Sequence, residues 1–452
     1  MSIKSLTPLE GRYGAITAPF GDYFSEWALI KYRIHVEVEW LIAMANNPVF
    51  SQIRAFTPDE VTFLRNLVNN FDDAAALRIK EIERTTNHDV KAIEYYLRET
   101  LGAMSLSDVL EFIHFSCTSE DINNLSYALM LKHGVEDVWL PKAQELVDAV
   151  TAMAKEEKDI PMLAHTHGQA ASPTTVGKEL AVFVYRWNRQ LKQIRAQEYL
   201  GKFNGAVGNF NAHSIAYPEA DWEAVSRAFV EGLGLTYNPL TTQIESHDYV
   251  AEAFHALTRF NNILLDFDRD MWLYISLAYF KQKAIAGEVG SSTMPHKVNP
   301  IDFENAEANL GLSNAILDHL ANKLPVSRLQ RDLSDSSAQR NIGTGIAHSH
   351  LALTYTLKGL KKTIVNKDAL AADLNHAWEV LSEAVQTVMR KHGHANSYDK
   401  LKAITRGKGI SEEDIKAFIG SVEMPEADKK RLLTLTPAQY VGIAASLIKH
   451  IE

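Results

Sequence analysis

The sequence has 452 residues, 46% of them hydrophobic and 23% charged, which is an ordinary composition for a globular protein. Its formal net charge of −10 argues against non-specific binding to nucleic acid or to an anionic membrane surface. The single cysteine, Cys117, excludes an intrachain disulfide framework and any CxxC metal or redox motif.

The first residues, MSIKSLTPLEGRYG, contain no apolar core of signal-peptide length, and no run approaches the roughly 20 apolar residues of a membrane span. We therefore expect a cytoplasmic protein that binds neither membrane nor nucleic acid.

Helical patterns dominate the chain from its N-terminal end, and no convincing series of alternating strands is found. Residues 1–111 contain shorter helices, such as 58–83 and 89–100. A long helix is predicted to begin near Ser119, where Thr118 or Ser119 can cap it ahead of acidic residues. It should continue to about residue 159, with Pro141 as a point where it could bend.

Further long helices follow in the central part of the chain. The clearest spans about 246–283, where nine apolar residues from Val250 to Ala278 take eight steps over 28 residues, an average of 3.5. That spacing is typical of a helix packed in a bundle. The other predicted helices cover about 174–200, a segment that begins after Pro300, and about 336–361.

This pattern predicts an all-α fold with three parts. We expect an N-terminal helical domain at 1–111, a central long-helix bundle at 112–364 and a C-terminal helical domain at 365–452, where shorter, more charged helices return. Long amphipathic helices tend to expose apolar surface that partner subunits can bury, so a homo-oligomer is expected.

Four polar segments interrupt the helical pattern, and each precedes a helix. They are RTTNHD at 84–89, SCTSED at 116–121, AHTHGQ at 164–169 and KQKAIAGEVGSSTMPHKVNP at 281–300. Free N–H groups at helix N-termini would form an anion-binding site if these segments converge. The last segment combines a small, flexible run with Lys297 and Asn299, and such a loop can supply donors to a developing oxyanion. The alternative interpretation is an ordinary flexible linker.

The sequence of residues 290–300, GSSTMPHKVNP, resembles the signature loop G-S-S-x-M-P-x-K-x-N-P of the aspartase/fumarase superfamily. Other motifs are similar, in the same order, to those of the adenylosuccinate lyase family within it, closest to its longer bacterial form. These are GRY at 11–13, NHD at 87–89, TSED at 118–121, THGQ at 166–169, TTQIE at 241–245, His296 in the loop and RDLSDSSAQR at 331–340.

The resemblance implies a three-domain fold whose central helices form a twenty-helix core in a homotetramer, with active sites built from three subunits. The implied reaction is β-elimination of fumarate from adenylosuccinate, giving AMP. A second implied substrate is succinylaminoimidazole carboxamide ribotide (SAICAR), which gives AICAR in the same purine pathway. The implied partners are these small nucleotides, and no metal or organic cofactor is implied.

The resemblance also implies roles for particular residues. Ser291 would be the general base, and Lys297 and Asn299 would stabilise the charge that forms on the substrate carboxylate. His167 would be the general acid, which suits a group whose unperturbed pKa is about 6.5. Glu304 would orient His167, and His88 would position substrate. Further implied substrate-binding residues are Arg12, Tyr13, Asn87, Asp89, Thr118, Ser119, Thr166, Gln243, Ser292, Val298, Asn305, Arg331, Ser336 and Arg340.

Three alternatives remain at this level. Another lyase of the superfamily, such as argininosuccinate lyase or fumarase, would share the loop. A non-catalytic structural homologue would share the fold. Arg331 and Arg340 could also be no more than a solvated helix end, although an arginine fork fits phosphate oxygens well.

Overall fold

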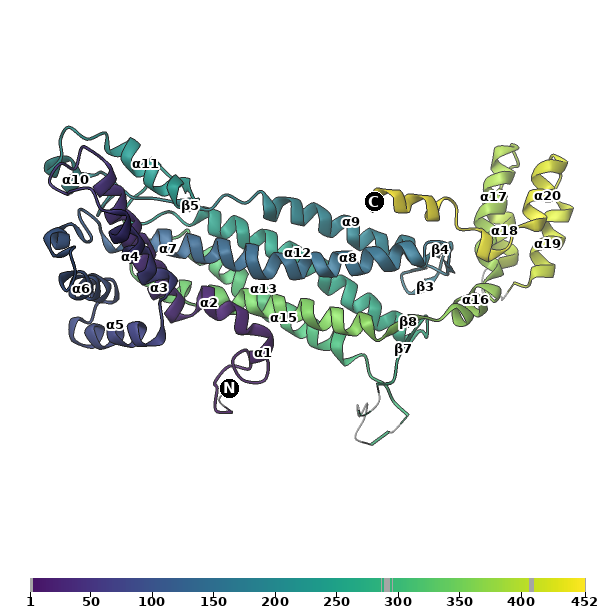
Figure 1. Ribbon diagram of the computed structural model, residues 1–452. Coiled ribbons are helices and arrows are strands. Elements are labelled where there is room, and N and C mark those ends of the chain that lie inside the picture. The colour runs from purple at the N-terminus through teal and green to yellow at the C-terminus, as the bar shows by residue number, and fades with distance from the viewer. Residues whose placement is uncertain (1–2, 286, 288–292, 295, 406–409, 452) are drawn as a thin grey trace. The chain divides into compact units, whose positions relative to one another are not determined.

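The computed structural model describes residues 3–285, 287, 293–294, 296–405 and 410–451 (Figure 1). The chain divides into two compact units. The first unit comprises 1–143, 190–262 and 308–354, and the second comprises 144–189, 263–307 and 355–452. The divisions fall within or next to five long helices, which are α8 (Leu140–Glu156), α9 (Val176–Arg195), α12 (Asp248–Ser276), α13 (Ile301–Lys323) and α15 (Ile342–Lys361).

The first unit begins with short helical turns, and longer helices follow from α3 onwards. Its elements up to the central bundle are α1 (Gly14–Thr17), η1 (Ala18–Phe20), α2 (Gly21–Phe24), α3 (Glu26–Asn46), α4 (Pro58–Asn69), α5 (Asp73–Thr86), α6 (Asp89–Gly102), η2 (Ser107–Phe112), α7 (Ser119–His133) and η3 (Gly134–Trp139). Its later elements are β5 (Leu200–Gly201), α10 (Asn211–Ala216), α11 (Trp222–Gly232), β6 (Thr236–Tyr237) and α14 (Ser334–Gln339).

The single helix predicted over 58–83 is wrong, because two helices cover that region. Helix α4 begins with a capping box in which Thr57 and Glu60 bond each other's backbone N–H groups. Asp72 then caps a new helix, α5, by accepting a hydrogen bond from the backbone of Ala75 at 2.9 Å. The prediction over 89–100 is confirmed by α6.

The long helix predicted after Thr118 is confirmed as a continuous helical run over α7, η3 and α8. Thr118 is its N-cap, and the run ends at Glu156. The segment η3 is π-helical and ends at Trp139, two residues before Pro141. A π segment of this kind is one way a helix accommodates a change in its hydrogen-bond ladder next to a proline, which has no N–H.

The core of the first unit holds a chain of buried hydrogen bonds between long helices. Trp139 Nε1 donates to Ser349 Oγ at 2.8 Å, and Ser349 Oγ donates to Asn261 Oδ1 at 2.6 Å. Asn261 Nδ2 donates to Ser313 Oγ at 3.0 Å. Because buried polar groups that lack partners are costly, this chain favours one register of the helices over others.

The second unit contains the remaining parts of the long helices, short hairpins and a C-terminal helical cluster. Its strands are β1 (Pro161–Met162), β2 (His165–Thr166), β3 (Gln169–Ala170), β4 (Thr174–Thr175), β7 (Phe280–Gln282) and β8 (Thr363–Val365). Strand pairs β1–β4, β2–β3 and β7–β8 are antiparallel, whereas β5–β6 in the first unit is parallel. Every sheet described has two strands of two or three residues, which fits the all-α class.

The C-terminal part of the second unit consists of short helices (Figure 1). They are α16 (Lys367–Asn375), η4 (Trp378–Leu381), α17 (Ser382–Lys391), α18 (Ser397–Thr405), α19 (Glu412–Ser421), α20 (Glu426–Thr434), η5 (Pro437–Gln439) and η6 (Ala444–Ile451). Helices η4, α17, α18, α19 and α20 share an apolar core, and Trp378, Met389, Ile415 and Leu432 are among its buried residues. The sequence predicts three domains with boundaries near 111 and 364, whereas the structure divides into two compact units. The three-domain division stays a prediction.

Three predicted helices end or break where the sequence pattern continued. Helix α12 stops at Ser276, because Ala278 adopts a left-handed backbone (φ 60°) and the chain enters β7. Helix α9 ends at Arg195 and residues near 200 form β5. The helix predicted over 336–361 is two helices, α14 and α15, separated at Arg340. Among the described residues, no helix is long and apolar enough to cross a membrane.

Candidate active site

His167 lies at the tip of a tight hairpin in the second unit. Strands β2 and β3 pair with Thr166 opposite Gln169, which leaves His167 and Gly168 as a two-residue turn. Both turn residues have positive φ, 53° and 72°, as a type I′ hairpin turn requires. A left-handed histidine is uncommon, and such strained residues concentrate at functional sites. The side chains of His167 and Thr166 are exposed.

The two ends of the signature loop are held by the second unit. At its start, β7 pairs with β8, and Lys283 N donates to Lys362 O at 2.7 Å. At its end, buried Asp302 in the first turn of α13 forms ion pairs with Lys358 and Lys362 at 3.1 and 3.0 Å. Both ends are therefore tied to the same C-terminal part of α15 and the turn that follows it.

The residues of the signature loop itself are only partly described. Ser291 and Ser292 lie outside the described residues. Lys297 is exposed, and its N–H donates to Met294 O at 3.1 Å. Val298 O accepts a hydrogen bond from Gln282 Nε2 at 3.0 Å. Asn299 is half-buried directly before Pro300 and α13.

Glu304 is exposed on the first turn of α13 and accepts a hydrogen bond from Trp272 Nε1 at 2.9 Å. Asn305 follows it and is half-buried. The predicted orientation of His167 by Glu304 therefore stays a prediction.

Thr118 and Ser119 lie at the N-terminus of α7 in the first unit, next to a buried ion pair between Asp121 and Lys202 that we call the anchor. Asp121, which is fully buried, accepts a hydrogen bond from Thr118 N at 2.8 Å and pairs with Lys202 Nζ at 2.9 Å. It also accepts from the backbone N–H of Asn204 and of Gly205. A helix N-terminus with a fixed first turn is suited to binding an anion, as the sequence motif predicts.

The NHD motif forms the junction between α5 and α6. Asn87 ends α5 in the left-handed conformation (φ 49°), and His88 caps α6. His88 Nδ1 accepts a hydrogen bond from Lys91 N at 3.1 Å. Neutral His88 therefore carries its proton on Nε2, so this exposed ring can donate a hydrogen bond to a ligand.

The predicted residues Gln243, Arg331 and Ser336 meet in the first unit. Arg331 donates to Ser336 Oγ at 2.9 Å and to Gln243 Oε1 at 3.3 Å. It also pairs with buried Glu120 at 3.0 Å. Its buried Nε has no hydrogen-bond partner among the described residues. An arginine whose two terminal nitrogens are held in place and whose Nε–H has no partner among the described residues is suited to binding an anionic ligand.

A chain of polar contacts that the sequence did not predict joins this set to the NHD motif. Asn123 Nδ2 donates to Glu120 Oε1 at 2.9 Å, and Asn123 Oδ1 accepts from Arg33 Nε at 2.9 Å. Arg33 in turn pairs with Asp89 at 2.8 Å, and Asp89 pairs with Arg340 at 3.2 Å. Arg33 and Asn123 lie inside helices α3 and α7 and in no recognised motif, so no sequence signal pointed to them.

The pKa values of the two carboxyl groups in this chain, Asp89 and Glu120, are shifted in opposite directions. Burial opposes ionisation of Asp89, but the charge and hydrogen bond of Arg33, with Arg340 beside it, outweigh that effect and lower the pKa of Asp89. Burial raises the pKa of Glu120, and Arg331 and Asn123 offset only part of the rise. The network therefore joins three arginines to two carboxyl groups, with Asp89 shared between Arg33 and Arg340.

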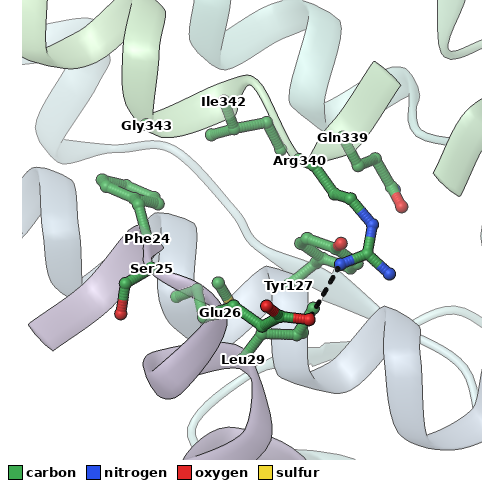
Figure 2. A pocket seen from close by; sticks show the side chains of 10 residues that line it. Phe24, Ser25, Glu26, Leu29, Tyr127, Gln339, Arg340, Ile342 and Gly343 are labelled. Carbon is green, nitrogen blue, oxygen red and sulfur yellow. Dashed lines mark ion pairs between the residues drawn. The ribbon is translucent and has the colours of Figure 1, made fainter. Parts of the chain in front are cut away.

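Arg340 also lines a cavity of about 240 Å³ within the first unit (Figure 2). Figure 2 shows its guanidinium facing the carboxylate of Glu26, with an N–O distance of 4.0 Å. Phe24 lines the same cavity and touches Gly343 so closely that a Cβ there would lie 2.4 Å from the Phe24 Cβ. Arg340 thus stands between two carboxylates, Asp89 and Glu26.

Arg12 and Tyr13 lie directly before α1 in the first unit. Tyr13 N donates to Pro8 O at 2.8 Å, and the Arg12 guanidinium lies 5.8 Å from the centre of the Tyr13 ring. Their predicted contact with a nucleotide remains a prediction. Among the described residues, no group of three or more His, Cys, Asp or Glu side chains is arranged to hold a metal ion.

Known protein families match almost the whole chain, including the residues described above. Residues 11–316 match a family described as Lyase, and residues 327–441 match one described as Adenylosuccinate lyase C-terminal. A solved fumarate lyase from Mesorhizobium sp. BNC1 is similar, with a TM-score of 0.76, 18% identity and coverage of 96% of this chain and 97% of that one. At that identity the likeness shows the fold alone.

Two curated relatives match from end to end. The chain is 55% identical to the adenylosuccinate lyase of Vibrio cholerae over 448 residues, which cover 99% of this chain and 98% of the relative. It is 53% identical to that of Escherichia coli K12 over 452 residues, which cover 100% and 99%. The chain therefore belongs to the lyase family and, within that family, to the adenylosuccinate lyases. The predicted family membership and the all-α fold class are confirmed.

Proposed function

We propose that this protein catalyses β-elimination of fumarate from adenylosuccinate, giving AMP, and from SAICAR, giving AICAR. The observation that carries this proposal is the full-length match to the adenylosuccinate lyases, which includes their C-terminal family over 327–441. That matched segment contains Arg331, Ser336 and Arg340, and two of these, Arg331 and Ser336, are joined by a hydrogen bond in the first unit.

In the proposed reaction Ser291 removes a proton from the succinyl carbon next to a carboxylate. The negative charge spreads into that carboxylate, where Lys297 and Asn299 stabilise it. The electron pair then forms the carbon–carbon double bond of fumarate as the carbon–nitrogen bond breaks. His167 donates a proton to the departing purine nitrogen, which completes AMP.

The binding roles divide by the charge of the substrate. Arg331, Ser336 and Arg340, with Arg12 and Tyr13, would hold the phosphate, because arginine forks match its oxygens. The succinyl group would be held by Thr118, Ser119, Thr166 and Gln243. His88 would donate from Nε2 to position the substrate, and the hydrogen bond at its Nδ1 supports that role.

The same proposal includes a cytoplasmic homotetramer whose active sites combine residues of three subunits. Two features support assembly. All six residues 165–170 of the catalytic hairpin are exposed, and α12 exposes Trp272 and Leu273 at 43% and 48%. Apolar surface of this kind on a long helix is suited to burial by a partner subunit.

The decisive test is fumarate release from adenylosuccinate, argininosuccinate and malate in parallel. We expect turnover of adenylosuccinate alone. Turnover of argininosuccinate or malate in its place would assign another lyase activity, and no turnover of any of the three would indicate a non-catalytic homologue. Light scattering of the purified protein tests the tetramer separately.

A further inference from the structure

Arg33 is a buried cation outside every motif of the proposed site. Only 4% of it is exposed, and it lies in the middle of α3. Its NH2 group donates to Asp89 Oδ2 at 2.8 Å, and its Nε donates to Asn123 Oδ1 at 2.9 Å. One guanidinium therefore joins α3 to the first residue of α6 and to the first turns of α7.

Asp89 shares a single oxygen between two arginines. Its Oδ2 accepts hydrogen bonds from Arg33 at 2.8 Å and from Arg340 at 3.2 Å. The two cations compete for the same negative charge, so each weakens the attraction of the other. Arg33 is enclosed by the protein, whereas 46% of the Arg340 side chain is exposed. Arg340 is therefore the partner that can leave Asp89.

We propose that Arg33 is a positioning residue that keeps Arg340 available to the phosphate of the nucleotide. This inference rests on the proposed function, which assigns Arg340 to that phosphate. With Arg33 in place, the charge of Asp89 is largely balanced from inside the protein. Without Arg33, Asp89 would take Arg340 as its main counter-charge, and the nucleotide would have to compete with a half-buried carboxylate for that guanidinium.

The second arm of Arg33 gives a way to separate this role from a general structural one. Because Asn123 accepts from Arg33, its amide donor faces Glu120 and thereby supports the Glu120–Arg331 pair. Replacing Asn123 by Ala breaks that arm but leaves the contact between Arg33 and Asp89. Such a change should affect binding through Arg331 and not through Arg340.

The experiment uses the full-length protein and the variants Arg33→Met, Arg33→Lys and Arg340→Gln, together with the Arg33→Met/Arg340→Gln pair. We would measure kcat and KM for adenylosuccinate, and the Kd of AMP by calorimetry. Arg33→Met should raise KM and the AMP Kd about tenfold, as expected for coupled neighbouring charges, with kcat changed by less than about twofold. Arg33→Lys keeps the charge beside Asp89 and should restore most of the affinity.

The double variant decides the mechanism. Arg33→Met also removes the hydrogen bond to Asn123, so Asn123→Ala is included to measure that arm alone. If Arg33 acts through Arg340, then in the Arg340→Gln background Arg33→Met should weaken AMP binding no more than Asn123→Ala does, whereas in the wild-type background it should weaken AMP binding more. Additive effects of Arg33→Met and Arg340→Gln, or a fall in kcat at unchanged KM, would overturn the role of Arg33. Circular dichroism checks folding, and Arg33→Gln, which keeps polar donors, replaces Arg33→Met if that variant does not fold. A wild type inactive on adenylosuccinate contradicts the proposed function instead.

Discussion

Replacing Lys202 by Met tests the anchor beneath the α7 N-terminus. Lys202 and Asp121 are both fully buried, and their charged atoms lie 2.9 Å apart. Lys202 Nζ also donates to Gly205 O at 2.9 Å. The substitution removes the charge and the donor while roughly preserving side-chain length, so Asp121 keeps its backbone hydrogen bonds but loses its counter-ion.

The expected loss follows from this geometry. At 2.9 Å the direct attraction is about 6 kcal/mol with an effective dielectric constant of 20, and part of it is offset because Lys202 no longer has to be desolvated. Breaking a buried pair from one side typically costs about 3–5 kcal/mol. Asp121 retains the N–H donors of Thr118, Asn204 and Gly205, so we expect the lower end, about 3 kcal/mol.

The measurement is the thermal unfolding curve at pH 7, recorded by circular dichroism. A loss of about 3 kcal/mol in a unit of this size corresponds to a Tm lowered by roughly 6–12 °C. Lys132→Met is the matched control, because Lys132 makes one hydrogen bond, to Gly234 O at 2.7 Å, at an exposed site. That variant should unfold within about 2 °C of the wild type.

A second substitution separates charge from packing. Asp121→Asn combined with Lys202→Met removes both charges and keeps one of the two oxygens that accept from the backbone, so it should regain part of the lost stability. If Lys202→Met unfolds at the wild-type temperature, or if the double variant is less stable than the single one, then the buried charge of Asp121 is not what Lys202 compensates.

The remaining predictions concern catalysis and pH. Ser291→Ala should abolish fumarate release and leave the oligomer intact by light scattering; near-normal turnover would disprove the assignment of the base. Gly168→Ala should lower kcat by about tenfold or more, because the left-handed φ of 72° at this position strains an L side chain and the strain displaces His167. Gly168→Asn should lower kcat less, since Asn tolerates a left-handed backbone better than Ala. Equal kcat values for the two variants would contradict this role of the turn. The pKa of Asp428 is lowered from 3.8 to about 2, and the hydrogen bond from His392 is the largest cause. Ionised Asp428 therefore stabilises the fold above about pH 4, and this stabilisation is lost as the pH falls towards 2. The Tm advantage of the wild type over Asp428→Asn should therefore shrink below pH 4, and an advantage unchanged at pH 2.5 would contradict the pKa shift.

The sequence by itself determined the helical class, the family and the motifs. Helix α12 was predictable because its apolar residues repeat with the period of a packed helix. The start of α7 was predictable because an N-cap is a local signal, formed by Thr118 and Asp121 only three residues apart. The signature loop and the THGQ motif were recognisable as strings of residues, which need no structure to read.

Only the tertiary structure decided how those motifs are held. Ala278 and Arg340 end helices that periodicity would have continued, because packing and backbone reversal at those points outweigh local propensity. The left-handed turn that carries His167 depends on the pairing of two short strands. Arg33 reaches Asp89 and Asn123 across 56 and 90 residues of chain, and no local pattern encodes a buried contact over such a separation.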